Sequence, residues 1–184
     1  MKTREITYVA LFVAVMAVLG MVPPIMLSFT PVPIVLQTLG VILAGGVLGA
    51  RLGFMSQVTF LLLVAAGLPL LSGGRGGIGV FIGPSAGYLF SYPIVAALLG
   101  FLLSRFQAWT LRKILLINLT IGVFTLYLFG IPVQAFVMDL SLIHTIKISL
   151  VYIPGDLIKA TAASYLVYKL RKSTAVAKQF AKAG

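Results

Sequence analysis

Apolar residues fill long segments of this chain, and the few charged residues fall mainly between those segments. A helix needs about 20 mainly apolar residues to cross the hydrocarbon core of a bilayer, and several segments reach that length. The pattern predicts six membrane-spanning helices, at Ile6–Val22, Ile34–Ala50, Phe54–Leu71, Gly87–Leu103, Ile114–Val133 and Leu157–Tyr168. A further apolar stretch, Leu140–Ile153, leads into the last of them.

Composition indicates the same class of protein. Of the 184 residues, 60% are hydrophobic and 9% are charged, and the mean hydropathy is +1.13. A soluble domain of this size could not cover such a chain with a polar surface. We therefore expect an all-α membrane protein with a single integral membrane domain over residues 1–184. The absence of cysteine excludes a disulfide, a thiolate nucleophile and a Cys-ligated metal.

The basic residues divide unequally between the two sides of the predicted bundle. With six spans, eleven of the fourteen fall on one side: Lys2, Arg4, Arg51, Arg105, Arg112, Lys113, Lys169, Arg171, Lys172, Lys178 and Lys182. Such residues mark cytoplasmic connections, so both termini are predicted to be cytoplasmic. We attribute the net charge of +11 to this topology and to anionic lipid head groups. Nucleic acid is not an expected partner, because no basic stripe carries interleaved aromatic residues.

Two ionisable residues, Asp156 and Lys159, lie near the start of the last predicted span. An ionisable group inside a bilayer costs several kcal/mol unless it is paired or hydrated, and it therefore marks a candidate functional site. The i,i+3 spacing places both side chains on one helical face. Two interpretations stay open: an internal ion pair that holds the helix end, or a pair that divides the polar groups of a ligand.

Two connections on the same side as Asp156 contain unusual amounts of proline and glycine. Residues 23–33 hold four prolines and cannot be helical, and residues 67–88 hold a run that includes Gly74, Gly76 and Gly77. Non-helical backbone at membrane depth is tolerated where it lines a cavity, and glycine allows the backbone to approach a ligand closely. We expect a packed pocket wall here rather than a flexible linker.

Three further side chains are candidates for the same pocket. Tyr88 could stack on a ring and hydrogen-bond through its hydroxyl, and Phe29 could form an apolar wall. Gln37 lies at the mouth of the second predicted span, where it either contacts a ligand or bridges two helices.

Small residues form two stripes at helical spacing. Gly45, Gly49 and Gly53 are expected to allow close packing within the bundle. Ala10 and Ala14, with Ala17 one turn further on, form a stripe on the first span. That pattern does not separate packing inside the bundle from a docking face for another subunit.

Five separated motifs, in the same order, closely resemble the BioY family of biotin-specific substrate-binding (S) subunits of energy-coupling factor (ECF) transporters. They are Pro31-Val32-Pro33-Ile34 with Gln37-Thr38, Gly67-Leu68-Pro69, Gly73-Gly74-x-Gly76-Gly77, Gly83-Pro84-Ser85-x-Gly87-Tyr88-Leu89, and Pro154-Gly155-Asp156-Leu157-Ile158-Lys159-Ala160. The resemblance covers nearly the whole chain and is weakest over Arg105–Lys147.

The resemblance implies a six-helix bundle in a prokaryotic cell membrane, without enzymatic activity and with no cofactor. Its biotin pocket would lie near the extracytoplasmic side. The implied partners are a coupling transmembrane subunit and two ATPase subunits. Ala10-x-x-x-Ala14 matches the alanine pair through which these S subunits meet the coupling subunit.

Two positions depart from the usual family pattern. Ser85-Ala86 stands where Thr-Gly is expected, and this change keeps a hydroxyl beside the implied pocket. Arg75 interrupts the glycine-rich turn. It either meets the biotin carboxylate as a forked donor or is an exposed loop charge.

Biotin offers two ureido N–H donors, a ureido carbonyl and a carboxylate. Ionised Asp156 suits the ureido N–H groups, and Lys159 suits either the ureido carbonyl or the carboxylate. The alternatives are an S subunit for another small vitamin, an ion channel or facilitator lined by Asp156 and Lys159, and an intramembrane enzyme. The polar residues concentrate near one side, which argues against a channel. No nucleophile–base pair or metal-ligand cluster supports an enzyme.

Overall fold

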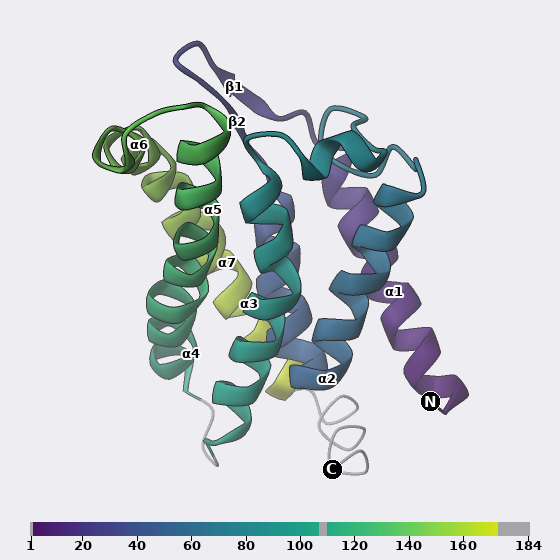
Figure 1. Ribbon diagram of the computed structural model, residues 1–184. Helices are drawn as coiled ribbons and strands as arrows, with labels where there is room; N and C mark the ends of the chain where they lie inside the picture. The colour runs from purple at the N-terminus through teal and green to yellow at the C-terminus, as the bar shows by residue number, and fades with distance from the viewer. Residues whose placement is uncertain (1, 107–109, 173–184) are drawn as a thin grey trace.

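The computed structural model describes residues 2–106 and 110–172, which form a helical bundle with a small β-hairpin at one end (Figure 1). In chain order the elements are α1 (Thr3–Gly20), β1 (Ile25–Leu27), β2 (Thr30–Ile34), α2 (Gln37–Ala65), the 3₁₀ turn η1 (Ile78–Phe81), α3 (Ala86–Ser104), α4 (Leu111–Ile117), the π-helical turn η2 (Asn118–Gly122), α5 (Val123–Val137), α6 (Leu142–Ser149), the 3₁₀ turn η3 (Leu150–Tyr152) and α7 (Ile153–Lys172).

The second and third predicted spans form one element, α2, which folds back on itself at Gly49. The backbone there has φ +81° and ψ 180°, a non-helical conformation that glycine adopts without strain. A Cβ built on Gly53 would lie 3.1 Å from the carbonyl oxygen of Ala44. These two residues would be about 13 Å apart along a straight helix. The two halves of α2 therefore pack against each other, and the predicted break between the spans lies close to the observed reversal.

Within residues 2–106 and 110–172, four helical segments are long and apolar enough to cross a membrane. They are Thr3–Gly20, Gln37–Ala65, Ala86–Ser104 and Leu111–Val137, the last made of α4, η2 and α5 in continuous succession. The predicted sixth span lies inside α7, a 20-residue helix that carries Asp156 and Lys159 and ends in three basic residues. Leu140–Ile153 forms α6 and η3, two short elements that precede α7.

The glycine stripe packs within the bundle, as predicted. A Cβ on Gly45 would overlap the carbonyl oxygen of Ala96 on α3, and Gly53 contacts the first half of α2. Gly49 differs from the other two, because it forms the reversal and a Cβ built on it would meet no atom within 4 Å; its backbone is instead the surface on which Gly100 of α3 packs. Small residues thus let the halves of α2 and the neighbouring α3 approach to backbone contact.

The first span leaves its alanine stripe outside the bundle. α1 packs inward through Val9, Phe12 and Met16, which are buried, whereas Ala10 and Ala14 are exposed. Of the two interpretations open for this stripe, packing inside the bundle is wrong for Ala10 and Ala14. The structure leaves their face free for contact with lipid or with another chain.

The proline-rich connection is not helical, as predicted, but it is also not an irregular loop. β1 and β2 pair as an antiparallel hairpin, so the described part of the chain is mainly, though not entirely, helical. Thr30, Val32 and Pro33 on β2 are buried, and Pro31 is exposed. The buried residues place β2 over the end of the bundle. Prolines are tolerated here because a two-stranded ribbon consists of edge strands.

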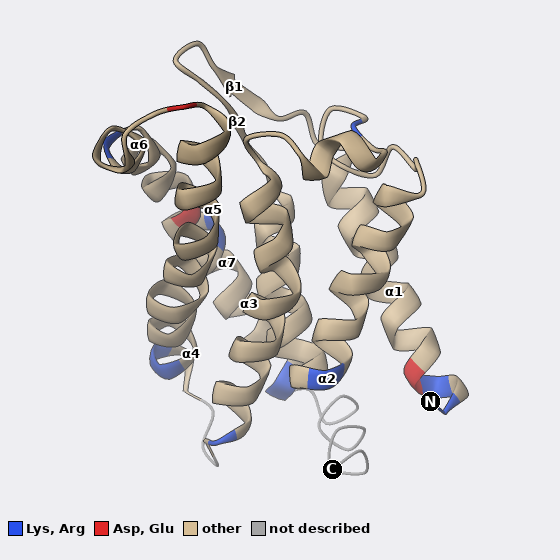
Figure 2. Ribbon diagram, in the orientation of Figure 1, with Lys and Arg blue, Asp and Glu red and all other residues tan. Residues whose placement is uncertain are grey.

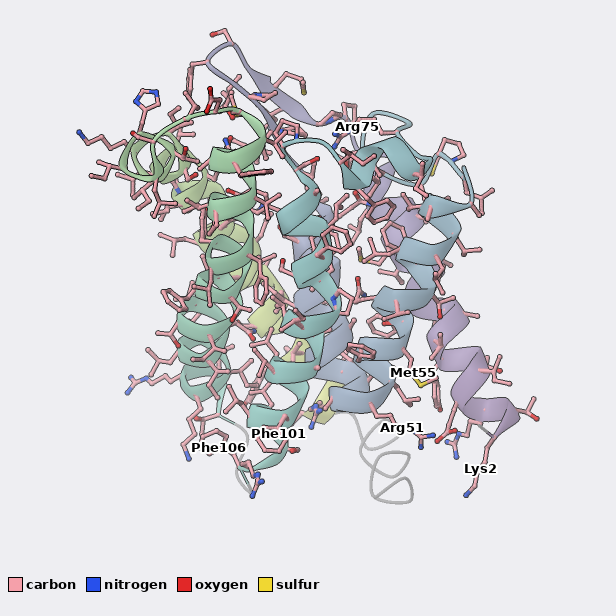
Figure 3. The ribbon with its side chains drawn as sticks, in the orientation of Figure 1. Lys2, Arg51, Met55, Arg75, Phe101 and Phe106 are labelled. Atoms are coloured by element: carbon pink, nitrogen blue, oxygen red, sulfur yellow. The ribbon has the colours of Figure 1, made fainter. Side chains whose placement is uncertain are left out.

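Lys and Arg gather mainly at the end of the bundle away from the hairpin (Figure 2). Figure 3 places Lys2 and Arg51 at that end and Arg75 at the hairpin end. Arg51 contacts Glu5 at 3.7 Å. The distribution has the asymmetry expected from the sequence, and the cytoplasmic placement of the termini stays a prediction.

Candidate ligand pocket

A cavity lies beneath the β-hairpin, where α3, α5 and α7 converge on the start of α2. Its empty volume is about 610 Å³, including space at its mouth that is open to solvent. Its lining is mainly apolar and aromatic: Val32, Pro33, Ile34, Val35, Gln37, Thr38, Leu71, Arg75, Ser85, Tyr88, Leu89, Tyr92, Leu126, Tyr127, Tyr152, Asp156 and Lys159. A concave, mostly apolar site with a few converging polar groups is the usual form of a small-molecule pocket.

Asp156 and Lys159 form a close ion pair in the wall of this cavity. The Nζ atom of Lys159 lies 2.6 Å from Oδ1 of Asp156, and the two residues are only 8% and 9% exposed. Lys159 also donates to the backbone carbonyl of Val35 at 3.0 Å, in the link between β2 and α2. The geometry fits both interpretations of the pair, since the two groups neutralise each other and also line the cavity.

Tyr127 completes the environment of the carboxylate. Its hydroxyl donates to Oδ2 of Asp156 at 2.5 Å, so each carboxylate oxygen has a donor. A hydrogen bond to a charged acceptor is among the stronger ones in proteins. Tyr127 also packs edge-on against Tyr88, with ring centroids 6.3 Å apart. Tyr127 was not predicted, because a tyrosine in an apolar span has no distinguishing local pattern.

A chain of hydrogen bonds joins the cavity wall to the hairpin. Tyr88 donates to Oε1 of Gln134 at 3.1 Å, and Nε2 of Gln134 donates to Oγ1 of Thr30 at 3.3 Å. Thr30 and Tyr152 lie 2.7 Å apart, and Tyr152 donates to the carbonyl of Val32 at 3.1 Å. Because the Tyr152 proton is used at Val32, Thr30 donates to Tyr152. These hydrogen bonds therefore connect α3, α5 and η3 to Thr30 and Val32 of β2.

Gln37 uses its side-chain amide to hold neighbouring segments together. Its Nε2 donates to the carbonyls of Met16 at 3.1 Å and Leu70 at 3.0 Å, and its Oε1 accepts from the backbone N–H of Ser72 at 3.2 Å. Of the two roles predicted for it, the bridging role is the one that the contacts support. Gln37 lines the cavity while its amide ties α1, α2 and the 66–85 connection together.

Arg75, Ser85 and Tyr88 also line the cavity. Arg75 pairs with Leu71 in an isolated β-bridge, and its Nε donates to the carbonyl of Ser72 at 3.2 Å. These contacts fix the start of the side chain at the hairpin end of the pocket. Of the ten predicted ligand-contacting residues, six line the cavity: Arg75, Ser85 and Tyr88 with Gln37, Asp156 and Lys159. Their role toward a ligand stays a prediction.

The other four predicted residues do not line this cavity. Phe29 lies in the turn between β1 and β2 and is 54% exposed. Gly74 borders a separate hollow beside the end of α1. Gly76 packs on the backbone of Leu68, and the N–H of Gly77 donates to the carbonyl of Val64 at 2.8 Å. These glycines shape the turn that carries Arg75 and do not themselves border the cavity.

The remaining lining residues were not predicted. Tyr92 lies one turn beyond Tyr88 on α3, and Leu126 precedes Tyr127 on α5. Tyr152, in η3, forms a hydrogen bond with Thr30 of the hairpin. The i,i+4 spacing of Tyr88 and Tyr92 was the one available signal, because it places both rings on one helical face.

The chemistry of the cavity is that of binding. Among residues 2–106 and 110–172, no group of three or more His, Asp or Glu side chains could hold a metal ion. The polar groups at the cavity are an acceptor carboxylate, two cationic donors, and hydroxyls that can donate or accept. Such a set can hold a ligand that has its own donors, a carbonyl and an anionic group, set in an apolar frame.

The sequence model of the BioY family matches residues 1–176. This chain belongs to the BioY family. The BioY protein of Bacillus subtilis strain 168, described as a probable biotin transporter, is 49% identical over 173 residues, which is 94% of this chain and 93% of that protein. The BioY biotin transporter of Rhizobium etli is 44% identical and covers 90% of this chain and 92% of its own length.

A solved structure has the same fold. It is the crystal structure of the S-component for biotin from an ECF-type ABC transporter, with a TM-score of 0.90, 38% sequence identity, and coverage of 94% of this chain and 93% of that one. The BioY relatives are described as transporters, and the described part of this chain has four helices with the length and composition of membrane spans. Together these findings identify a multi-pass protein of the cell membrane that is not an enzyme.

Proposed function

We propose that this chain is the biotin-binding S component of an ECF-type importer. It captures biotin in the cavity beneath the β-hairpin and passes it on through a coupling transmembrane subunit driven by two ATPases. The observation that carries the proposal is the buried Asp156–Lys159 pair, which opens onto an apolar cavity in a chain whose relatives are described as biotin transporters.

The cavity contains a complement for each part of biotin. The tyrosines and leucines of the wall suit the apolar bicycle. The carboxylate of Asp156 suits the ureido N–H groups, and the ammonium of Lys159 suits the ureido carbonyl or the valerate carboxylate. Arg75 lies on the lining at the hairpin end, where its guanidinium suits the carboxylate as a two-pronged donor.

The proposal includes a six-span arrangement with both termini in the cytoplasm. The reversal of α2 at Gly49 divides it into two rods, and α7 supplies the sixth. The end rich in Lys and Arg is then cytoplasmic by the positive-inside rule, and the hairpin and cavity face the outside. In this orientation biotin reaches its pocket from the extracytoplasmic side.

The exposed stripe of α1 is the proposed docking face for the coupling subunit. Ala10 and Ala14 are exposed and lie one turn apart, so a partner helix can approach the α1 backbone closely. The cavity lies beneath the hairpin, between α3, α5 and α7, and neither alanine lines it. Binding and docking are therefore separable functions on this chain.

The experiment that tests the function is equilibrium binding of radiolabelled biotin to the purified, detergent-solubilised protein. An Asp156→Asn, Lys159→Met double variant is measured beside it. We expect saturable binding by the wild type and its loss in the double variant. A folded wild type that binds no biotin would overturn the assignment, and other small vitamins and then ion flux would be measured on the same preparation.

A further inference from the structure

The short helix α6 differs from the rest of the bundle in its direction and its surroundings. Figure 1 shows it nearly end-on beside the hairpin end, while the long helices run along the bundle. At eight residues it is about 12 Å long and cannot span a bilayer. Ser141 caps its first turn by accepting from the N–H of His144 at 3.3 Å, so the helix is a defined element rather than a frayed end.

The side chains of α6 and the following turn divide into three faces. Thr145 and Ser149, one turn apart, are buried against the protein. A second face, spanning an arc of about 100°, is apolar and exposed. It consists of Leu142, Ile143, Ile146 and Leu150, with Ile143 69% exposed. A third face carries the exposed polar residues His144 and Lys147.

The exposed apolar face continues onto the neighbouring helix. α6 packs against α5, whose end presents Phe136, 88% exposed, together with Val137. α5 belongs to one of the four segments with the composition of a membrane span. Its exposed apolar residues, Phe124, Leu128 and Phe129 among them, are those that lipid would cover. The apolar face of α6 therefore extends a lipid-facing surface around the end of the bundle.

Lys147 and His144 limit how deep this helix can lie. A charged side chain placed in the hydrocarbon core is costly, but at the interface it can reach the phosphates of lipid head groups. A helix with an apolar face beside a basic polar face has the pattern of an interfacial helix.

We propose that α6 lies in the outer head-group layer of the bilayer, with Leu142, Ile143, Ile146 and Leu150 inserted among the upper acyl chains and with Lys147 facing anionic head groups. The partner of this surface is the lipid itself. The helix leads through η3 directly into α7, so the membrane surface supports the segment that positions Tyr152 and Asp156.

Site-directed spin labelling of the full chain in lipid vesicles tests this proposal. The chain has no cysteine, so single Cys variants at 142–151 need no other change. Collision rates of each nitroxide with oxygen, which concentrates in lipid, and with a water-soluble nickel chelate separate lipid from aqueous exposure. Vesicles of phosphatidylcholine and phosphatidylglycerol serve as the membrane, and only variants that still bind biotin are compared.

We expect the oxygen-to-nickel ratio to be severalfold higher at Ile143 and Ile146 than at His144 and Lys147, with Thr145 poorly accessible to both reagents. The ratio should oscillate with a helical period along the scan. Equal nickel accessibility at Ile143 and Lys147 would place the helix in water and overturn the proposal. Low accessibility to both reagents at Ile143 and Ile146 would also overturn it, because a protein chain would then cover this face.

Discussion

Removing the charges of Asp156 and Lys159 one at a time and then together separates their structural and ligand-binding roles. Asp156→Asn leaves the ammonium of Lys159 in a site where that residue is 8% exposed, and Lys159→Met leaves the carboxylate of Asp156 at 9% exposure. Breaking a buried pair costs about 3–5 kcal/mol, because the remaining charge has lost its partner. For a chain of this size that loss corresponds to a fall of roughly 6–20 °C in the unfolding midpoint.

The double variant has no unpaired charge, and replacing both members of a buried pair is often nearly neutral for stability. We therefore expect thermal stability to recover in Asp156→Asn, Lys159→Met, close to the wild-type midpoint. Biotin binding should not recover, because the proposed acceptor and donor for the ligand are both gone. Thermal unfolding in detergent and radiolabelled biotin binding, measured on the same four proteins, give the two readouts.

Arg51→Met is the matched control for removing a charge from an ion pair. Arg51 lies 3.7 Å from Glu5 with its side chain 71% exposed, so its loss should cost less than about 1 kcal/mol. Recovery of biotin binding together with stability in the double variant would refute the reasoning, since the pair would then be only an internal bridge. Single variants as stable as Arg51→Met would refute the expectation that an unpaired charge at this site lowers the stability of the fold.

Four further predictions concern the pocket and its surroundings. Gly130→Ala should weaken biotin binding, because a Cβ there would overlap the ring of Tyr88; binding assays on the folded variant measure this. Gln37→Leu removes three hydrogen bonds and should lower the free energy of unfolding by roughly 2–4 kcal/mol, measured by thermal or denaturant unfolding. Arg75→Ala should weaken biotin more than biotin methyl ester in competition binding. Ala14→Phe should leave biotin binding intact and abolish uptake by the assembled transporter.

A control variant or a contrary result tests each of these four predictions. Gly79→Ala places a Cβ where no atom lies within 4 Å, so it should bind biotin normally. Gln57→Leu removes a buried amide whose Oε1 has no partner and should be much less destabilising than Gln37→Leu. Equal losses for biotin and its methyl ester would exclude Arg75 from the carboxylate. Normal uptake by Ala14→Phe would exclude the alanine face from docking.

The sequence predicted those parts of the structure that depend on local patterns. Apolar length identified the long helices, and Asp156 and Lys159 were found because ionisable residues are conspicuous in an apolar segment and their i,i+3 spacing fixes a common face. The break in α2 was located to within a few residues of Gly49. Motifs that carry the family resemblance, at residues 31–38, 83–89 and 154–160, supply part of the cavity lining, and their role toward biotin stays a prediction.

Contacts between distant segments could not be predicted in the same way. Tyr127 reaches Asp156 across 29 residues of chain, and Thr30 meets Tyr152 across 122. Such pairs depend on how the helices pack, which no local spacing records. Gly74 was assigned to the pocket because glycine suits both close ligand approach and tight turns, and the composition of a loop does not separate these uses. Its positive φ of +69° identifies the turn.

The second hydrogen bond of Lys159, to the carbonyl of Val35, links the pocket to the position of the hairpin. A ligand oxygen that attracts the Lys159 ammonium competes with a backbone group at the base of β2. Ligand occupancy and the local stability of the hairpin are then coupled equilibria, and each must alter the other by the same free energy. Amide exchange across residues 25–36 should change when biotin binds, and identical exchange with and without biotin would exclude the coupling. Through the ammonium group of Lys159, the local stability of the β-hairpin would depend on whether the cavity beneath it holds a ligand.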